Sequence, residues 1–172
     1  KRGGFQGRVI VVEKDPTYQW CASGRAVAGI RQQFSTPENI RISQFGVGFF
    51  RHIKQEFGPD ADIAFRERGY LIMATPEGRA TLEANIRLQN SLGADTELLE
   101  PADITRRFPW LACDDLGAAG WGRTGEGWID PASLVQLFRK GAIANGVTYQ
   151  ADTAVAIETE GGRINGVKLQ SG

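Results

Sequence analysis

The sequence has little histidine or cysteine, no net charge and no long apolar run. Lys plus Arg and Asp plus Glu number 20 each, so electrostatics give no reason to expect nucleic acid or an anionic membrane as a partner. No apolar run approaches the roughly 20 residues that span a bilayer, so no membrane span is expected. The remaining composition is typical of a globular protein, and 172 residues suffice for one domain or for parts of two.

The two cysteines and the single histidine narrow the kinds of site further. Cys21 and Cys113 form no C-x-x-C pair, so we expect no disulfide framework and a reducing compartment. A cytoplasmic location is therefore expected, or the mitochondrial matrix if the source is eukaryotic. His52 has no Cys or His nearby and lies in a helical pattern, which favours a surface or packing role over a metal site.

Apolar spacing and turn signals predict a mixture of strands and helices. A β-branched run before Glu13 is typical of a buried parallel strand. Glu160-Gly161-Gly162-Arg163 predicts a hairpin turn. Helices are expected at 37–57, from 75 to about 93, at 101–107 and from 131 to about 146. Strands are expected at 8–13, at 70–74, within 117–129 and three times within 147–169. A parallel start and antiparallel later pieces predict an α/β (α+β) chain that crosses between two domains.

The acid that ends the first strand is a candidate binding residue. In a dinucleotide-binding βαβ unit, an acid at the end of the second strand accepts hydrogen bonds from the adenosine ribose, about 20 residues after a glycine fingerprint. Only twelve residues precede Glu13, too few to hold that fingerprint. We therefore expect the chain to be an internal fragment, although spacing alone also allows Glu13 to be an ordinary polar strand end.

A second candidate binding segment spans residues 28–33. It follows a stretch from residue 20 that is rich in Ala, Gly and Ser. Small residues let the backbone approach a flat ligand. Arg31, just beyond, would place positive charge near a ring that gains electrons. The alternative is a tightly packed loop with Arg31 in a surface ion pair.

Together and in this order, these segments resemble the D-amino-acid-oxidase-like flavoprotein superfamily. That superfamily includes glycine and sarcosine oxidases, dimethylglycine dehydrogenase-like enzymes and FAD-dependent oxidoreductase domain proteins of mitochondria. The resemblance implies a partial Rossmann-like FAD-binding domain from residues 1–53 and 131–172, and part of a mixed or antiparallel-sheet substrate domain from residues 54–130. It covers nearly the whole chain and rests on residues 9–15, 23–34, 37–39, 69–71, 101–109, 126–131 and 166–167.

The resemblance also implies contacts with FAD. Glu13 would bind the adenosine ribose, and the backbone of Val155 would meet the adenine. Ala26 stands where dimethylglycine dehydrogenase-like members carry a flavin-linked histidine, so FAD is expected to bind non-covalently. The residues expected to bind the cofactor are Glu13, Lys14, Ser23, Ala28, Gly29, Ile30, Arg31, Gln32 and Val155.

The implied reaction oxidises the C–N bond of an amino acid or of a secondary or tertiary amine by hydride transfer to FAD. The electron acceptor and the catalytic residues are not assigned. Candidates for gripping a substrate carboxylate are Arg66, Arg68 and Arg123, and Trp121 and Trp128 could wall the substrate cavity; surface charge and core packing are the alternatives.

Two other functional interpretations stay open. The chain could be a catalytically inactive module that does not bind FAD by itself, because the glycine loop for the pyrophosphate is absent from it. A nicotinamide-dependent dehydrogenase fits the first strand and its acid, but it fits the later antiparallel pieces and the loop from Gly29 poorly.

Overall fold

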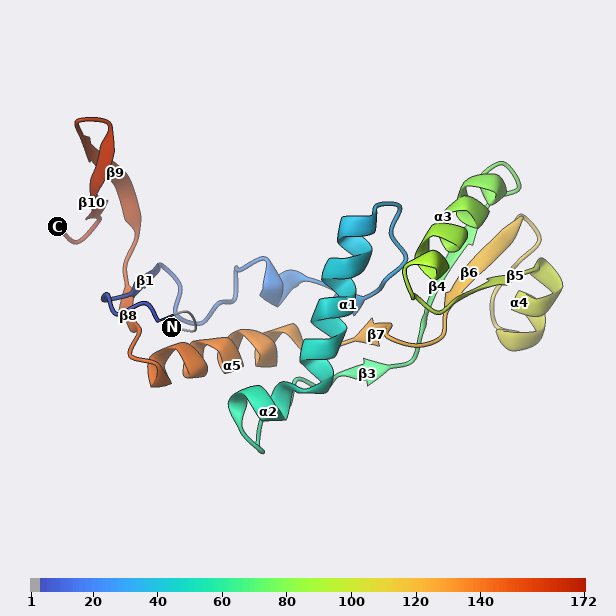
Figure 1. Cartoon of the computed structure of the whole chain (residues 1–172), viewed down its shortest axis with the longest axis horizontal. Helices are drawn as coiled ribbons and strands as arrows, with labels where there is room; N and C mark the ends of the chain where they lie inside the picture. Colours follow the sequence, from blue (N-terminus) through green and yellow to red (C-terminus); the bar gives the residue numbers. More distant parts are fainter. Residues whose placement is uncertain (1–3) are drawn as a thin grey trace. The chain divides into compact units, whose positions relative to one another are not determined.

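The computed structural model describes residues 4–172 (Figure 1), so the part of the predicted 1–53 segment before Gly4 lies outside it. The chain divides into two compact units. The first combines Lys1–Ala26 with Pro131–Gly172, and the second is Val27–Asp130. The α/β class is as expected, with helices and four small sheets. The assignment of a cofactor domain and a substrate domain stays a prediction.

The first unit contains the predicted parallel strand. Strand β1 (Ile10–Glu13) pairs in parallel with β8 (Thr148–Ala151). The expected burial is wrong, because Ile10 is 42% exposed and the rest of β1 is only half-buried. Within residues 4–172, β8 is the sole partner of β1, so one edge and much of each face lack a covering layer.

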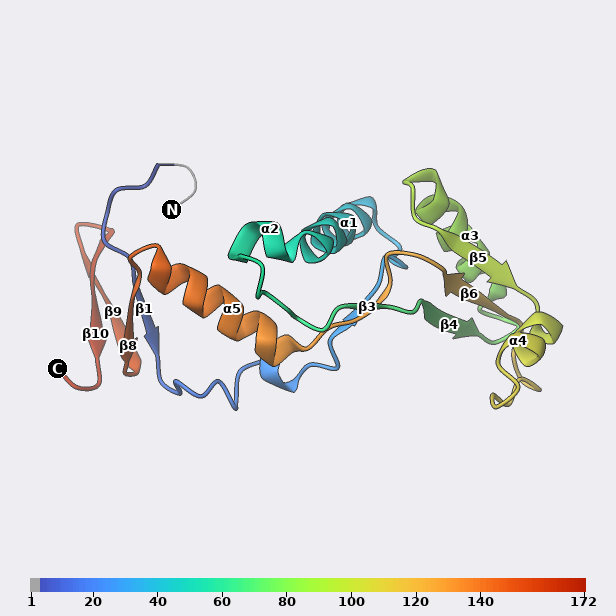
Figure 2. The same ribbon diagram turned by 90° about the horizontal axis from the view of Figure 1, so that it is seen from below.

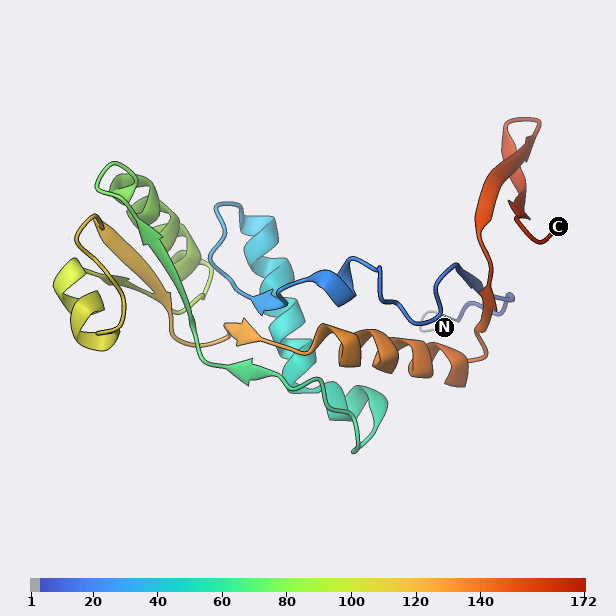
Figure 3. The ribbon, with the colours of Figure 1, turned by 180° about the vertical axis from the view of Figure 1, so that it is seen from behind.

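A helix and a hairpin complete this unit. Helix α5 (Pro131–Ala144) starts at the predicted proline and packs against the short 3-10 helix η1 (Ser23–Arg25). Strands β9 (Ala154–Glu160) and β10 (Arg163–Leu169) form the expected antiparallel hairpin, visible beyond β8 in Figure 3. Gly161 and Gly162 make the turn with φ of 57° and 75°, the left-handed conformation that a two-residue turn of this kind requires.

The second unit is built on an antiparallel sheet between two helices (Figure 2). Successive side chains of a strand face opposite sides of the sheet. Ala118 therefore lies against Leu82 and Ile86, whereas Ala119 lies with Leu99 and Ile104 on the other face. The elements are β4 (Tyr70–Ala74), β6 (Ala118–Gly122) and β5 (Thr96–Leu99), in that sheet order, with α3 (Arg79–Ser91) on one face and α4 (Pro101–Arg107) on the other.

A smaller antiparallel sheet in the same unit joins segments that are far apart in sequence. Its order is β2 (Gly29–Ile30), β7 (Gly127–Trp128) and β3 (Arg66–Glu67). Gly29 pairs with Trp128, and Ile30 pairs with Gly127. The central strand β7 thus holds the candidate cofactor segment against β3.

The predicted single helix over 37–57 is wrong, because it is interrupted at His52. Helix α1 is Pro37–Arg51 and α2 is Ile53–Phe57. Gly46 and Gly48 lower the helix propensity of the last turns of α1. The His52 ring Nδ1 lies 2.7 Å from the carbonyl oxygen of Gly48, so a local contact accompanies the break.

Over residues 4–172, no helix combines the length and the apolar character needed to cross a membrane. In the same range, no group of three or more His, Cys, Asp or Glu side chains is placed to hold a metal ion.

Candidate functional site

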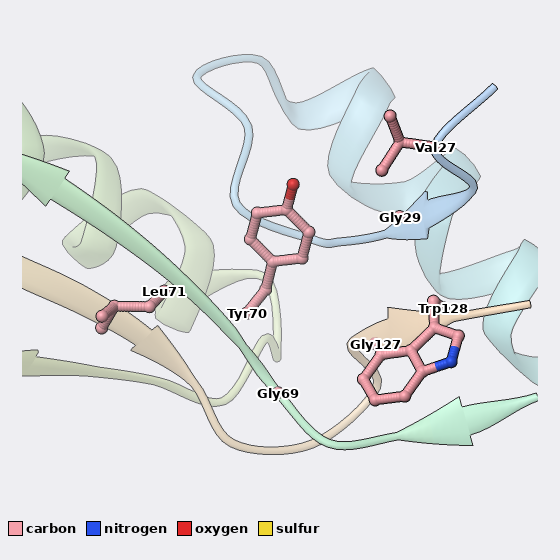
Figure 4. Close-up of a pocket in the computed structure, with 7 residues that line it drawn as sticks. All are labelled: Val27, Gly29, Gly69, Tyr70, Leu71, Gly127 and Trp128. Atoms are coloured by element: carbon pink, nitrogen blue, oxygen red, sulfur yellow. The ribbon is translucent and has the colours of Figure 1, made fainter. Parts of the chain in front are cut away.

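The second unit contains a pocket of about 360 Å³ beside the small sheet (Figure 4). Small-molecule sites commonly have volumes of roughly 300–1,000 Å³ and mostly apolar walls. The side chains that line this pocket within the described chain carry no charge: Val27, Gly29, Gly69, Tyr70, Leu71, Gly127 and Trp128.

Glycine and two aromatic rings shape the pocket. A Cβ added at Gly29 would lie 2.9 Å from the Tyr70 ring, so glycine allows that ring to approach the β2 backbone. Trp128, opposite Gly29 in the sheet, is 49% exposed. Figure 4 shows Tyr70, Trp128 and Val27 arranged around the Gly29 backbone. The pocket is therefore apolar and open, and the backbone of Gly29 forms its central surface.

The turn into β2 is conformationally special. Ala28 has φ of 57°, in the left-handed region that side-chain-bearing residues seldom adopt. Its carbonyl accepts a hydrogen bond from the Ile129 amide at 3.3 Å, which anchors the turn to the segment after β7. Strained backbone of this kind concentrates at binding sites.

Arg31 places a positive charge against one wall of the pocket. Its guanidinium carbon lies 5.2 Å from the Phe34 ring centroid and 5.8 Å from the Tyr70 ring centroid. Both distances are within the range of cation–π attraction. The Tyr70 ring itself lines the pocket, so this ring separates the Arg31 guanidinium from the pocket interior.

Glu126 is the buried acid of this region, with 1% of its surface exposed. Its Oε1 accepts the Gln32 backbone N–H at 2.5 Å, and its Oε2 accepts the Gln33 side-chain amide at 2.8 Å. Its backbone carbonyl accepts the N–H groups of Arg68 and Gly69 at 3.1 and 3.0 Å. One residue therefore joins the segment after β2 to the segment between β3 and β4.

The ionisation of Glu126 reflects two opposing influences. Burial raises the pKa of the carboxyl group above its ordinary value, because a charge is costly in an apolar interior. Hydrogen bonds from Gln33 and Gln32, and the positive charge of Arg31, act in the other direction but are smaller effects on that pKa.

The first unit presents Glu13 at the carboxyl end of β1, where parallel sheets bind ligands. Its Oε1 accepts the Asp15 N–H at 2.9 Å, and its backbone carbonyl accepts the Asp152 N–H at 3.2 Å. The ribose contact predicted for Glu13 stays a prediction. Lys14 is exposed beside it, and Val155 is 54% exposed near the start of β9. These features are compatible with the adenosine end of a dinucleotide.

The structure separates the predicted site residues by unit. Residues 28–32 belong to the second unit, where they lie along the pocket and β7. The first unit contains the other predicted cofactor residues: Glu13, Lys14, Ser23, which begins η1, and Val155.

Of the tryptophans proposed as cavity walls, Trp128 lines the pocket. Trp121 instead packs on Phe108, with ring centroids 5.3 Å apart, in the core beside α4.

None of the three arginines considered for a substrate carboxylate lines the pocket. Arg123 pairs with Asp95, and the Arg66 guanidinium donates to the Phe65 carbonyl at 3.4 Å.

Sequence reasoning missed Tyr70 and Glu126 as parts of this region. Tyr70 looked like the first residue of an ordinary strand. Glu126 had one available signal, its position between two glycines, Gly125 and Gly127. Glycine on both sides permits close approach of other chain segments and so favours enclosure of the acid.

Known proteins are similar to this chain in sequence and in fold. The chain is 40% identical over 154 residues to FAD-dependent oxidoreductase domain-containing protein 1 of Xenopus laevis; that match covers 87% of this chain and 30% of the relative. The chain thus spans about 30% of the length of the curated relatives it matches.

Two solved structures have a similar fold. L-proline dehydrogenase from P. horikoshii aligns with a TM-score of 0.81 at 28% identity, over 96% of this chain and 43% of that one. Glycine oxidase from Geobacillus kaustophilus aligns with a TM-score of 0.77 at 21% identity, over 96% of this chain and 45% of that one.

A family model described as FAD dependent oxidoreductase (DAO) matches residues 1–172. The match extends over both compact units and includes Glu13 and the Gly29 pocket. The chain therefore belongs to the FAD dependent oxidoreductase (DAO) family.

Proposed function

We propose that this protein oxidises the C–N bond of an amino acid or of a secondary or tertiary amine, with non-covalently bound FAD as the hydride acceptor. The observation that carries the proposal is the open apolar pocket at Gly29 with Arg31 stacked behind its Tyr70 wall. Two similar proteins, L-proline dehydrogenase and glycine oxidase, are named for amino-acid substrates, which supports the same reaction class here.

The residues of this chain have distinct parts in that proposal. Glu13 holds the adenosine ribose with Lys14 beside it, and Val155 presents its backbone to the adenine. Ser23 and the segment Ala28–Gln32 follow the pyrophosphate and the ring. When bound, the flavin supplies the two-electron acceptor, and the protein positions it and tunes its surroundings.

The apolar lining favours a neutral amine over a protonated one. An ammonium ion there would find no carboxylate in the described lining, and cation–π contacts with Tyr70 and Trp128 would offset only part of its lost hydration. The substrate nitrogen therefore gives up a proton to solvent before its C–H bond is broken. Its lone pair then forms the C=N bond of an iminium ion as the hydride leaves. Tyr70 and Trp128 provide flat walls for the carbon skeleton.

Anaerobic mixing of the complete FAD-loaded protein with a panel of amino acids and alkylated amines tests the proposal. We expect at least one of them to bleach the visible flavin band. Trp128→Ala should raise the dissociation constant of that substrate, because Trp128 lines the pocket and about half of its surface is exposed to a ligand. Trp110→Ala is the matched control, since Trp110 is exposed in the loop after α4. Equal affinities in both variants would count against this pocket as the substrate site.

A further inference from the structure

The surroundings of Glu126 are shaped around its carboxylate. A Cβ added at Gly122, on β6, would overlap the carboxyl group. One added at Gly125, which has φ of 69°, would overlap the side-chain amide of Gln32. That amide donates to the carbonyls of Thr124 and Gly125 at 3.4 and 3.3 Å. Neighbouring glycines therefore make room for both the acid and the amide beside it.

The hydrogen-bond donors around Glu126 require an acceptor on each of its oxygens. A backbone N–H faces Oε1, and a side-chain amide N–H faces Oε2. A carboxylate accepts at both atoms, whereas a glutamine would turn its own NH₂ group towards one of these donors. An opposed pair of hydrogen-bond donors in a buried place is destabilising, because neither donor has an acceptor. The geometry therefore selects an acid at position 126, although burying a charge is itself unfavourable.

The segments that Glu126 joins are the walls of the pocket. Its side chain binds Gln32, two residues after Ile30 on β2. Its backbone carbonyl binds Gly69, the residue before Tyr70. Gly127, the next residue in the chain, lines the pocket as well. Arg31, the cation against the Tyr70 wall, is the residue before the N–H that Glu126 binds. A displacement of the carboxylate would therefore move the β2 wall and the cation together.

We propose that Glu126 is a positioning residue, which fixes the Gly29–Gln33 segment and the charge of Arg31 at the pocket in the geometry that hydride transfer requires. This inference rests on the proposed function. Glu126 does not itself line the pocket or contact the substrate there. It acts through the Gln32 N–H and the Gln33 amide on one side, and through the backbone of Gly69 on the other.

The main test compares Glu126→Gln with Glu67→Gln in the complete FAD-loaded protein. Glu67 is a matched control, because its Oε1 accepts the N–H of the neighbouring Gly125 at 2.9 Å while its carboxylate pairs with Arg51 near the surface. We expect Glu126→Gln to lower the limiting rate of flavin reduction per bound FAD on the order of 10- to 100-fold, the scale of small misplacements at a reacting centre. The dissociation constant of the substrate should change little, and Glu67→Gln should reduce at the wild-type rate.

A purely structural role gives a different result. It would lower the melting temperature and the FAD content but leave the reduction rate per bound FAD unchanged, and that outcome would overturn the inference. If Glu126→Gln does not fold, Gln33→Leu serves instead. It removes the amide that donates to Oε2 and to the Tyr70 carbonyl while keeping the acid, so a smaller fall in the same rate is expected; an unchanged rate would equally overturn the inference.

The visible circular dichroism of bound FAD separates failure of the inference from failure of the proposed function. If no amine or amino acid reduces the wild-type protein, the proposed reaction is wrong. The flavin signal would still report the geometry around the ring. We expect it to change in Glu126→Gln and to stay as in wild type in Glu67→Gln; identical signals in all three proteins would refute the positioning role.

Discussion

Substitution of Gly122 by alanine tests whether the carboxylate of Glu126 is held as tightly as its contacts indicate. The new Cβ would overlap that carboxyl group, so one of the two must move. A side-chain end normally moves at little cost, but Glu126 is held by two buried hydrogen bonds from Gln32 and Gln33. We therefore expect Gly122→Ala to break at least one of those bonds.

The expected magnitude follows from the groups that are left unpaired. Each buried donor that loses its acceptor costs about 1–3 kcal/mol, so loss of both hydrogen bonds amounts to about 2–6 kcal/mol in local stability. A loss of 2 kcal/mol or more corresponds to faster amide exchange by roughly 30-fold or more, since each 1.36 kcal/mol is tenfold.

Hydrogen–deuterium exchange of the complete protein measures this directly. A peptide over residues 29–34 contains the Gln32 amide, which should exchange faster in Gly122→Ala than in wild type. Gly48→Ala is the control, because a Cβ at that position in α1 would meet nothing within 4 Å. It should leave this peptide unchanged and stabilise the helix by about 1 kcal/mol. Equal exchange over residues 29–34 in wild type and Gly122→Ala would refute the expected clash.

Three further predictions concern the cofactor and the buried acid. Glu13→Ala should weaken FAD binding roughly 10-fold or more in a fluorescence titration, since a hydrogen bond to a charged group contributes about 1.5–3 kcal/mol; Glu158→Ala, on the exposed hairpin, should not, and equal loss in both would argue against a ribose contact. Arg31→Ala should impair flavin binding or reduction, and unchanged reduction kinetics with full FAD content would contradict its place near the ring. Burial raises the pKa of Glu126 in the folded state above its ordinary value of 4.5, so its contribution to the free energy of unfolding is fully present below that pH and is lost as the pH rises through the raised pKa. Glu126→Gln does not titrate, so its deficit in that free energy should shrink over this window in urea unfolding; a deficit independent of pH would disagree with the burial effect.

Local signals allowed much of the fold to be predicted from the sequence. The strand before Glu13, the strand at 70–74 and the turn at Gly161-Gly162 depend on residue type and spacing within a few positions, and the structure contains all three. The interruption at His52 was not predicted, because apolar spacing continues through it and only backbone geometry reveals the break.

The site was harder to predict because its parts come together only on folding. The Gly29 segment was a candidate from its small residues, yet its pairing with Trp128 joins residues that are far apart in the chain. Glu126 meets Gln32 across a similar separation, so no local pattern of the sequence reveals that contact. Resemblance identified the family, and the structure then identified the buried acid behind the pocket.

The most direct test of the proposed reaction is anaerobic reduction of the complete FAD-loaded protein, followed by its visible flavin absorbance. The account predicts that an amino acid or a secondary or tertiary amine bleaches the flavin. It also predicts a faster reduction at higher pH, as more of the substrate becomes neutral. If a 2-hydroxy acid or another alcohol bleaches the flavin while no amine or amino acid in the panel does, oxidation of a C–N bond is contradicted.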